Sequence, residues 1–176
     1  MIWRVPGTLY RAPNIVERDH YRGGGLLAWA GIATNCRTDL YVFAGGSVTA
    51  VRYGDEILHP LVRPFIAAMG TDTIFMNDNS RPHRARLVRS YLESETIPQM
   101  AWPAKSPDLN PIEHVWDMLR RRIAGRSAPP GPLHELQQAL LQEWVLLPQK
   151  ATNYTIASMP RHCQACISAK GYRTRY

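Results

Sequence analysis

Two carboxylate residues in this sequence have the setting that metal-dependent chemistry requires. Asp78 follows the short apolar run 73–76, and Glu113 falls three residues after Asn110, at the start of a helical pattern. The two acids are separated by 34 residues. A carboxylate at a strand end and another in the first turn of a later helix can meet at the edge of an α/β sheet. Hard divalent cations such as Mg2+ take one or two carboxylates together with water and phosphate oxygens, so we expect a Mg2+ site here.

Each of these residues also has an ordinary structural interpretation. Asp78 stands in the sequence NDNS, which favours a turn by itself. Asn110, Pro111 and Glu113 occupy the N-cap, N1 and N3 positions of the expected helix, where Glu113 would complete a capping box by bonding back to the Asn110 backbone. The rigid sequence SPDLNP before that helix favours a further role for Glu113, because it would aim one carboxylate in a fixed direction.

The pattern of apolar residues predicts a mixed sheet that is covered by helices. Six segments have the length and composition of short strands: 1–5, 26–33, 38–44, 48–52, 73–76 and 97–102. Five segments have apolar residues at helical spacing or a helix start: 55–69, 82–95, 111–123, 133–147 and 160–169. Gly45 and Gly46 mark a hairpin turn, so 26–33, 38–44 and 48–52 should form an antiparallel meander. The later alternation of strand and helix implies a mixed sheet with helices on its faces.

Three of these segments have features that can be checked directly. The strand 26–33 is apolar throughout, as expected for a strand buried on both faces. Pro60 and Pro64 should kink the helix 55–69, and Gly70 should end it. The helix 111–123 should bury one apolar stripe: Ile112, Val115, Trp116, Leu119 and Ile123.

The charge of the chain points to an acidic partner. The 176 residues carry a formal net charge of +7, with 18 Arg and 3 Lys. The planar guanidinium group suits phosphate, so double-stranded DNA is the expected partner, although GC-rich coding would also enrich Arg. No apolar run approaches the roughly 18 residues that span a bilayer, so we expect no membrane partner. We also expect no small-molecule substrate.

Two stretches of the sequence resemble those of a known family. Residues 75–83 read FMNDNSRPH, and residues 102–117 read WPAKSPDLNPIEHVWD. With the 34-residue gap between Asp78 and Glu113, they closely resemble the Tc-like branch of the Tc/mariner superfamily of DNA transposases. The similarity extends from the apolar strand after the glycine run 23–25 to the end of the chain. The match over 102–116 is too long to arise by chance.

The resemblance implies a ribonuclease-H-like catalytic domain, which is a mixed sheet flanked by helices. Members of this family cut transposon ends and join them to target DNA with two Mg2+ ions, or Mn2+ in their place, held by Asp, Asp and Glu. By this resemblance Asp78 is the second carboxylate and Glu113 the third. Two metal ions about 4 Å apart can activate the attacking oxygen and stabilise the leaving one. The resemblance also implies a nuclear location, with a homodimer as a candidate assembly.

A basic surface beside the carboxylates would hold the DNA. The candidate residues lie on the helices 82–95 and 111–123 and in the segments before them: Arg81, His83, Arg84, Arg86, Lys105, Arg120 and Arg121. For each Arg, a solvated helix face is the alternative interpretation. The resemblance places His83 beside the second Asp, where it would orient a metal ligand or contact phosphate. A helix start without a chemical role is the alternative for His83.

The chain departs from the family pattern at its N-terminal side. The first Asp of the family lies on a strand upstream of every segment matched here, and Asp19, Asp39 and Asp55 fall in segments that match other parts of the pattern. We therefore expect a fold that lacks its first, central strand and a carboxylate triad that is incomplete. We also expect no Mg2+-dependent strand cleavage by these 176 residues alone.

These expectations define a domain organisation and an alternative function. Residues 1–124 should form a partial ribonuclease-H-like core, 125–132 a linker, and 133–176 the C-terminal helices and basic tail of the same domain. The alternative to a transposase catalytic domain is a non-catalytic relic of a transposon that binds DNA or a full-length transposase. The DNA that encodes the residues before Met1 would distinguish the two, because only the first requires an upstream strand ending in Asp.

Overall fold

A small antiparallel sheet lies at the centre of the molecule. The computed structural model describes residues 2–3, 25–70, 72–103, 106, 109–128 and 130–169. Three strands pair in the order β1–β2–β5, and two more form a hairpin: β1 Ile2–Trp3, β2 Leu26–Trp29, β5 Tyr41–Val42, β3 Ile32–Ala33 and β4 Cys36–Arg37. Ala28 pairs with Val42 in the three-stranded sheet. β3 follows β2 along the chain and pairs with β4.

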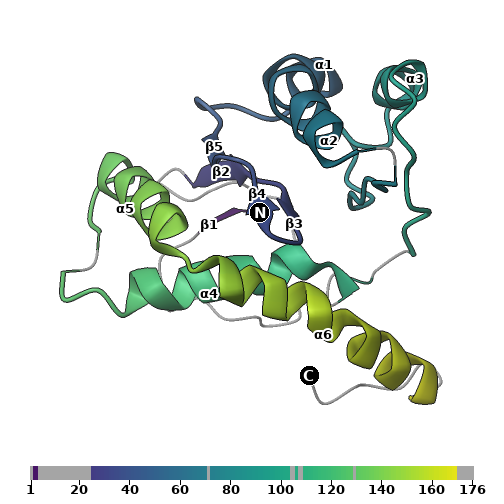
Figure 1. Ribbon diagram of the computed structural model, residues 1–176. Helices are drawn as coiled ribbons and strands as arrows, with labels where there is room; N and C mark the ends of the chain where they lie inside the picture. The colour runs from purple at the N-terminus through teal and green to yellow at the C-terminus, as the bar shows by residue number, and fades with distance from the viewer. Residues whose placement is uncertain are drawn as a thin grey trace.

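Helices cover the sheet from two sides. In chain order they are α1 Ala50–Tyr53, the π-helical η1 Gly54–Val62, α2 Arg63–Met69, α3 Arg86–Ser94, α4 Pro111–Ala124, α5 Leu133–Leu146 and α6 Gln149–Ser168. Figure 1 shows α1, α2 and α3 above the strands, α4 and α6 below them, and α5 at the left of the strands. Within the described part of the chain, no helix is both long enough and apolar enough to cross a membrane.

Each helical group encloses its own part of the core. The lower cluster joins Leu26, Ala28 and Ala30 to buried residues of α4 and α5, while the upper cluster joins Phe43 to buried residues of α1, η1 and α3. Leu27 and Trp29 are partly buried against the upper cluster. The segment 26–30 therefore has apolar contacts on both faces, as its sequence predicts, although only one face is fully buried.

The prediction for α4 is confirmed. The helix begins at Pro111 and ends at Ala124, and it buries Val115, Trp116, Leu119 and Ile123, while Ile112 packs partly buried against the same cluster. Trp116 stacks on Trp144 of α5 with ring centroids 5.9 Å apart. The Trp144 indole N–H donates to the Thr38 carbonyl oxygen at 3.0 Å, which fixes α5 to the sheet. This packing sets the direction in which the first turn of α4 points.

The predicted strand at 48–52 is wrong, because α1 occupies that position. Gly45 and Gly46 do form a turn, with φ values of 59° and 70°. The turn does not lead into a strand, since Thr49 caps a helix by accepting a hydrogen bond from the Arg52 backbone N–H at 3.2 Å. The β-branched residues of this segment favour a strand locally, and the Thr cap together with burial of Tyr53 outweighs that preference.

Other element boundaries differ from those predicted. The helix expected at 55–69 starts earlier, at Ala50, and ends before Gly70 (φ 94°) as predicted. Pro60 lies inside η1, where the chain adopts a π-helical register instead of ending. The helix expected from 160 starts at Gln149, so Pro160 lies in its interior and not at its first turn. The prediction failed there because proline is favoured at the first position of a helix.

The two strands that flank the candidate site are shorter than predicted. Segments 73–76 and 97–102 meet in one parallel bridge, Phe75 with Gln99. The strand expected at 38–44 is limited to β5. The helix expected at 82–95 starts only at Arg86, because residues 81–84 form turns and Ala85 has an extended backbone. The loop expected at residues 8–25 lies almost wholly outside the described residues.

Candidate active site

Asp78 is held in a short turn at the end of a paired segment. Phe75 donates its N–H to the Pro98 carbonyl at 2.8 Å and accepts from the Met100 N–H at 2.9 Å. Three residues later, one carboxylate oxygen of Asp78 accepts from the Ser80 N–H at 3.0 Å and lies 2.6 Å from His83 Nδ1. Asp78 therefore forms the turn that its sequence favours, and its carboxylate is fixed by two contacts.

His83 is itself fixed by a buried tyrosine. Its ring centroid lies 4.3 Å from that of Tyr53, which is 1% exposed. The hydrogen bond from His83 lowers the pKa of the Asp78 carboxyl well below its usual range, the Ser80 N–H adds to this, and partial burial opposes it. Asp78 is thus held in its ionised form, while 50% of its side chain stays accessible.

Glu113 lies in the first turn of α4 without acting as a cap. Its backbone N–H donates to the Asn110 carbonyl at 3.0 Å, but the Asn110 side chain makes no capping hydrogen bond. The Glu113 carboxylate has no hydrogen bond or ion pair to any described residue, so neither half of a capping box forms. Burial raises the pKa of Glu113, and the negative charge of Asp78 raises it further.

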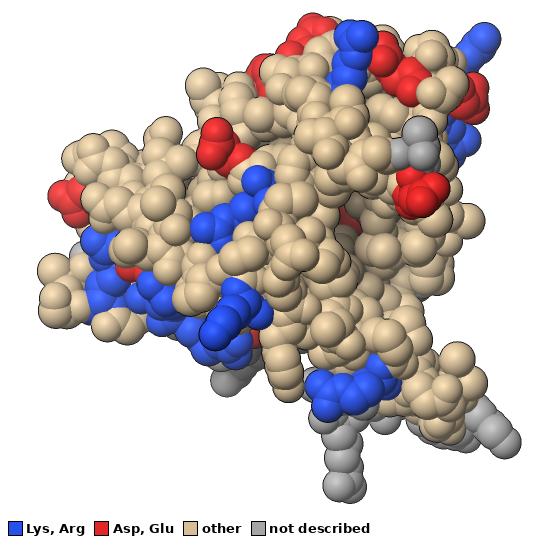
Figure 2. All heavy atoms as spheres, in the orientation of Figure 1, with Lys and Arg blue, Asp and Glu red and all other residues tan. Residues whose placement is uncertain are grey.

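The two carboxylates open onto the same cavities. Asp78 and Glu113 both line a main cavity of about 710 Å³ and a smaller one of about 220 Å³, and Asn110 lines both as well. Figure 2 shows the molecule hollowed between its upper and lower parts, with acidic atoms inside the hollow. The structure therefore brings together the two acids that the sequence singled out, although 34 residues separate them.

This arrangement suits a hard divalent cation that keeps part of its hydration shell. One carboxylate is held ionised by its neighbours, and a second lies half-buried nearby without an ion pair to any described residue. Mg2+ typically binds through one or two carboxylates plus water and phosphate oxygens. Among the described residues, no group of three or more His, Cys, Asp or Glu side chains could enclose a metal ion. The residues present thus fit an open site and not a closed cage.

A hydrogen bond links the two loops that carry the site. The Asn79 side-chain amide donates to the Trp102 carbonyl at 3.0 Å, which ties the turn around Asp78 to the segment leading into α4. Sequence reasoning did not assign a role to Asn79 or to Tyr53. Asn79 stands beside Asp78 in a turn motif, which is a usable signal, whereas nothing in the local sequence connects Tyr53 to His83.

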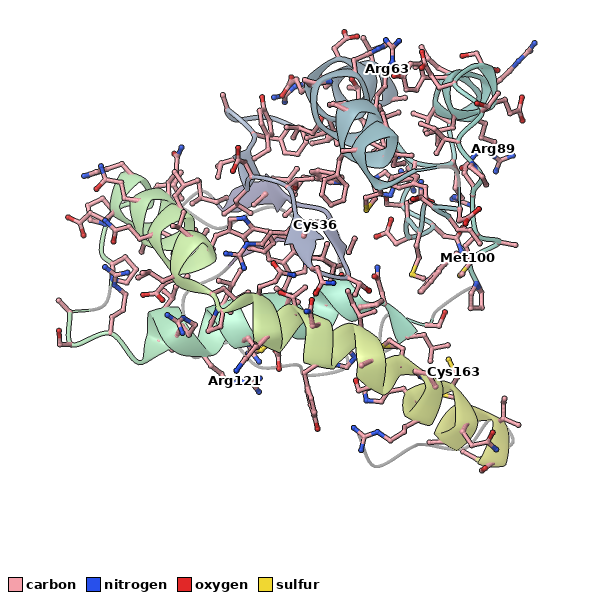
Figure 3. The ribbon with its side chains drawn as sticks, in the orientation of Figure 1. Cys36, Arg63, Arg89, Met100, Arg121 and Cys163 are labelled. Atoms are coloured by element: carbon pink, nitrogen blue, oxygen red, sulfur yellow. The ribbon has the colours of Figure 1, made fainter. Side chains whose placement is uncertain are left out.

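The basic residues predicted to bind DNA fall into two groups. Arg81, Arg84 and Arg86 are exposed in the segment before α3 and at its first residue. Arg120 and Arg121 are exposed on α4, where both bind Asp117, at 2.7 Å and 3.4 Å. Figure 3 shows Arg121 beneath α4 and Arg89 beside α3, at opposite sides of the molecule. Lys105 lies outside the described residues.

Comparison with known sequences adds independent information. The family model described as DDE superfamily endonuclease matches residues 27–131. The transposable element Tcb1 transposase of Caenorhabditis briggsae is 32% identical over 169 residues, which cover 95% of this chain and 59% of that protein. The Tc1 transposase of Caenorhabditis elegans is 37% identical over 125 residues, which cover 69% of this chain and 44% of that protein. The chain thus spans about half the length of the relatives it matches.

Comparison with solved structures defines the fold. The Mos1 mariner paired-end complex with Mn superposes with a TM-score of 0.75 at 19% identity, covering 98% of this chain and 51% of that one. The Mos1 transposase catalytic domain, solved with raltegravir and Mg, superposes with a TM-score of 0.66 at 21% identity, covering 85% and 84% of the two chains. This likeness confirms the predicted ribonuclease-H-like mixed α/β fold.

Proposed function

The chain belongs to the DDE superfamily endonuclease family, among the Tc/mariner transposases, and from this membership we propose that it is the catalytic domain of a cut-and-paste DNA transposase. The observation that carries the proposal is the meeting of Asp78 and Glu113 at one open cavity. The proposed reaction cleaves a phosphodiester bond in one DNA strand and joins the freed 3′ end to a second DNA molecule. The two acids are the proposed ligands of Mg2+ or Mn2+.

The residues of the site have different proposed roles in binding a cation and a phosphate. His83 and Ser80 keep Asp78 ionised and oriented towards the cavity. Glu113 is half-buried beside Asp78, so its negative charge is costly and is relieved by any cation bound between the two. When bound, divalent ions would polarise the phosphate and favour the attacking and leaving oxygens of an in-line displacement. The hydrogen bond from the Asn79 side chain to the Trp102 carbonyl would hold the two loops together while DNA binds.

The proposed partner is double-stranded DNA. The related Mos1 transposase has been solved as a paired-end complex with a left transposon end and as a strand transfer complex. In this chain, Arg81, Arg84 and Arg86 are exposed close in sequence to Asp78 and are suited to phosphate contacts. A homodimer and a nuclear location are parts of the same proposal, since the substrate would be chromosomal DNA with two transposon ends.

A plasmid-nicking assay tests the proposal. The chain would be incubated with supercoiled plasmid and Mg2+ or Mn2+, both as the 176 residues and with a designed Asp-bearing strand fused before Met1. We expect only the fused protein to nick, and Asp78→Asn or Glu113→Gln to abolish nicking. Glu93→Gln is the matched control, because Glu93 is exposed on α3. Nicking that survives both site substitutions would refute the assigned roles.

One observation favours a second function, that of a non-catalytic DNA-binding protein. The described residues provide two carboxylates at the cavity and no cluster of three metal-ligating groups. If neither protein nicks plasmid but both bind DNA with a steep salt dependence, this second function is the better account. A catalytic domain and a DNA-binding relic are thus separated by the same experiment.

A further inference from the structure

Two cysteines lie about one helical turn apart near the end of α6. Cys163 and Cys166 belong to the sequence CQAC, and α6 continues through both of them to Ser168. Both carry free thiols, as does Cys36 on β4, the third cysteine of the chain. Figure 3 shows Cys163 on the part of α6 that extends away from the strands. Neither thiol of the pair lines the cavities onto which Asp78 and Glu113 open.

The helix holds this thiol pair at a defined place on the surface. Cys163 is exposed and Cys166 is partly buried. The residue before them, His162, packs its ring on that of His114 with the ring centroids 5.0 Å apart, which fixes this part of α6 to the beginning of α4. Side chains three residues apart are neighbours on the surface of a helix. The two thiols therefore share one face of a helix whose position is set by packing.

The spacing of the pair suits a bridging ion better than a disulfide. The Cβ atoms of residues three apart on a helix are about 5–6 Å apart. A disulfide requires about 3.5–4.5 Å between its Cβ atoms, so it would distort α6 here. An ion that bonds two thiolates at about 2.3 Å allows the sulfurs to lie up to roughly 4.6 Å apart. The regular helix can therefore offer both sulfurs to one ion without a change of its backbone.

The type and number of the ligands select the ion. A structural Zn2+ site takes four ligands, whereas no group of three or more His, Cys, Asp or Glu side chains in the described part of the chain could hold a metal ion. His114 and His162 thus do not complete a zinc site with the thiols. Mg2+ and Mn2+ prefer oxygen ligands to sulfur. Cu+ is soft and prefers thiolate sulfur, and two thiolates in a near-linear arrangement are enough to hold it.

We propose that Cys163 and Cys166 of one chain together bind one Cu+ ion as a pair of thiolates. Each thiol gives up its proton to solvent when the ion binds, and each sulfur then donates an electron pair to the ion. The ion enters and remains as Cu+, so no electron is transferred and no oxidant or reductant takes part. The site differs in chemistry from the carboxylates Asp78 and Glu113, which suit hard ions, and it does not rest on the proposed function.

Competition with a chromogenic Cu+ chelator tests the site. The full chain is titrated with Cu+ without oxygen, in the presence of ascorbate and bathocuproine disulfonate, whose Cu+ complex is coloured. We expect the chain to withdraw one equivalent of Cu+ from the chelator. Cys163→Ser and Cys166→Ser should each weaken binding by about 100-fold or more, because a single thiolate cannot form the pair. Cys36→Ser is the matched control and should bind like wild type.

A spacing variant separates a site on one helix face from two thiols that are merely close in sequence. Cys163→Ser combined with Gln164→Cys keeps the number of thiols but puts them two residues apart, where side chains on a helix do not face each other. Gln164 is exposed, so we expect the fold to persist, and circular dichroism checks the helix content. This double variant should bind Cu+ as weakly as Cys163→Ser alone. Tight binding by either of these variants, or loss of binding in Cys36→Ser, would overturn the proposal.

Two further measurements examine the bound ion itself. X-ray absorption at the copper edge should show sulfur neighbours alone, and a large excess of Mn2+ should leave the Cu+ bound, because Mn2+ prefers oxygen. Size-exclusion chromatography should show the same elution with and without Cu+. A Cu+-dependent dimer would mean that two chains share the ion, and it would overturn a site within one chain, as would displacement by Mn2+. None of these measurements involves DNA cleavage, so their failure and the failure of the proposed function are separate results.

Discussion

Replacing His83 by Phe should test how Asp78 is held. Phe keeps an aromatic ring against Tyr53, whose centroid lies 4.3 Å from that of His83, and removes the 2.6 Å hydrogen bond to the carboxylate. A hydrogen bond to a charged group contributes about 1.5–3 kcal/mol to stability. Because the Asp78 side chain is 50% exposed, water replaces part of this bond in the variant, and we expect a cost of about 1 kcal/mol. The melting temperature should fall by about 2–4 °C.

The pH dependence of this effect has a definite sign. The hydrogen bond from His83 lowers the pKa of Asp78 in the folded protein, so its stabilising effect is fully present above the ordinary Asp pKa of about 4. The effect is lost as the pH falls from there through the lower pKa of the folded state. Nδ1 can donate from the neutral ring or the protonated one, so the bond can persist across this range. The difference between wild type and His83→Phe should therefore shrink below about pH 4.

Urea unfolding at a series of pH values, together with carboxyl-carbon NMR of Asp78, measures both parts of this prediction. His134→Phe is the control, because His134 is exposed on α5 and the same change there should leave Asp78 unaffected. The NMR titration should show a higher Asp78 pKa in His83→Phe than in wild type. An unchanged titration, or a stability difference that does not shrink as the pH falls from 4 to 2, would refute the proposed role of His83.

Three further predictions concern the proposed metal site, the core and the proposed DNA-binding surface. Without metal, Glu113→Gln should raise the melting temperature, because burial raises the pKa of this acid and makes its ionised form unfavourable at neutral pH. The same variant should lose the increase in melting temperature that we expect Mn2+ to give in wild type. Calorimetric scans with and without Mn2+ measure both effects. Glu143→Ala should cost about 2–3 kcal/mol in urea unfolding, because this buried carboxylate binds Arg122 at 2.7 Å and joins α4 to α5. Arg84→Ala should reduce the slope of log binding constant against log salt concentration for DNA by about 0.9 for each phosphate that the variant no longer neutralises. Arg121→Ala should change this slope less, because Arg121 is already paired with Asp117. Equal slopes for the two variants would count against this assignment.

The long helices of this fold could be predicted because their apolar residues repeat at helical spacing. For α4 the pattern, the proline at its first position and the buried stripe all agree, and its bounds are correct to within a residue. The prediction of a strand at 48–52 failed because β-branched residues over so short a length do not distinguish a strand from a helix. The helix cap formed by Thr49 favours the helix here. The prediction of a helix start at Pro160 failed for a different reason: proline is favoured at the first position of a helix, but Pro160 lies inside α6.

The meeting of Asp78 and Glu113 was predictable, because a strand end and a helix start bring carboxylates to one edge of a sheet. The contact of Tyr53 with His83, which holds the partner of Asp78 in place, could not be predicted. Tyr53 comes from α1, whose residues favour a strand by local preference, and its contact with His83 exists only after the upper helices pack together. Sequence patterns thus identify side chains that carry charge, whereas the groups that orient them depend on tertiary packing.

Ion pairs between arginines and acids reduce the number of arginines that could take part in the proposed binding of DNA. Arg52 and Arg63 bind glutamates in the upper helices, and on α4 the exposed arginines bind Asp117 or Glu143. The net charge of +7 therefore overstates the number of guanidinium groups that are free to meet phosphate. Arg84 and Arg86 have no acidic partner among the described residues, and they follow the turn that holds Asp78. DNA bound there would lie beside the carboxylates, so the same short segment would position both the acid and the phosphate that it acts on.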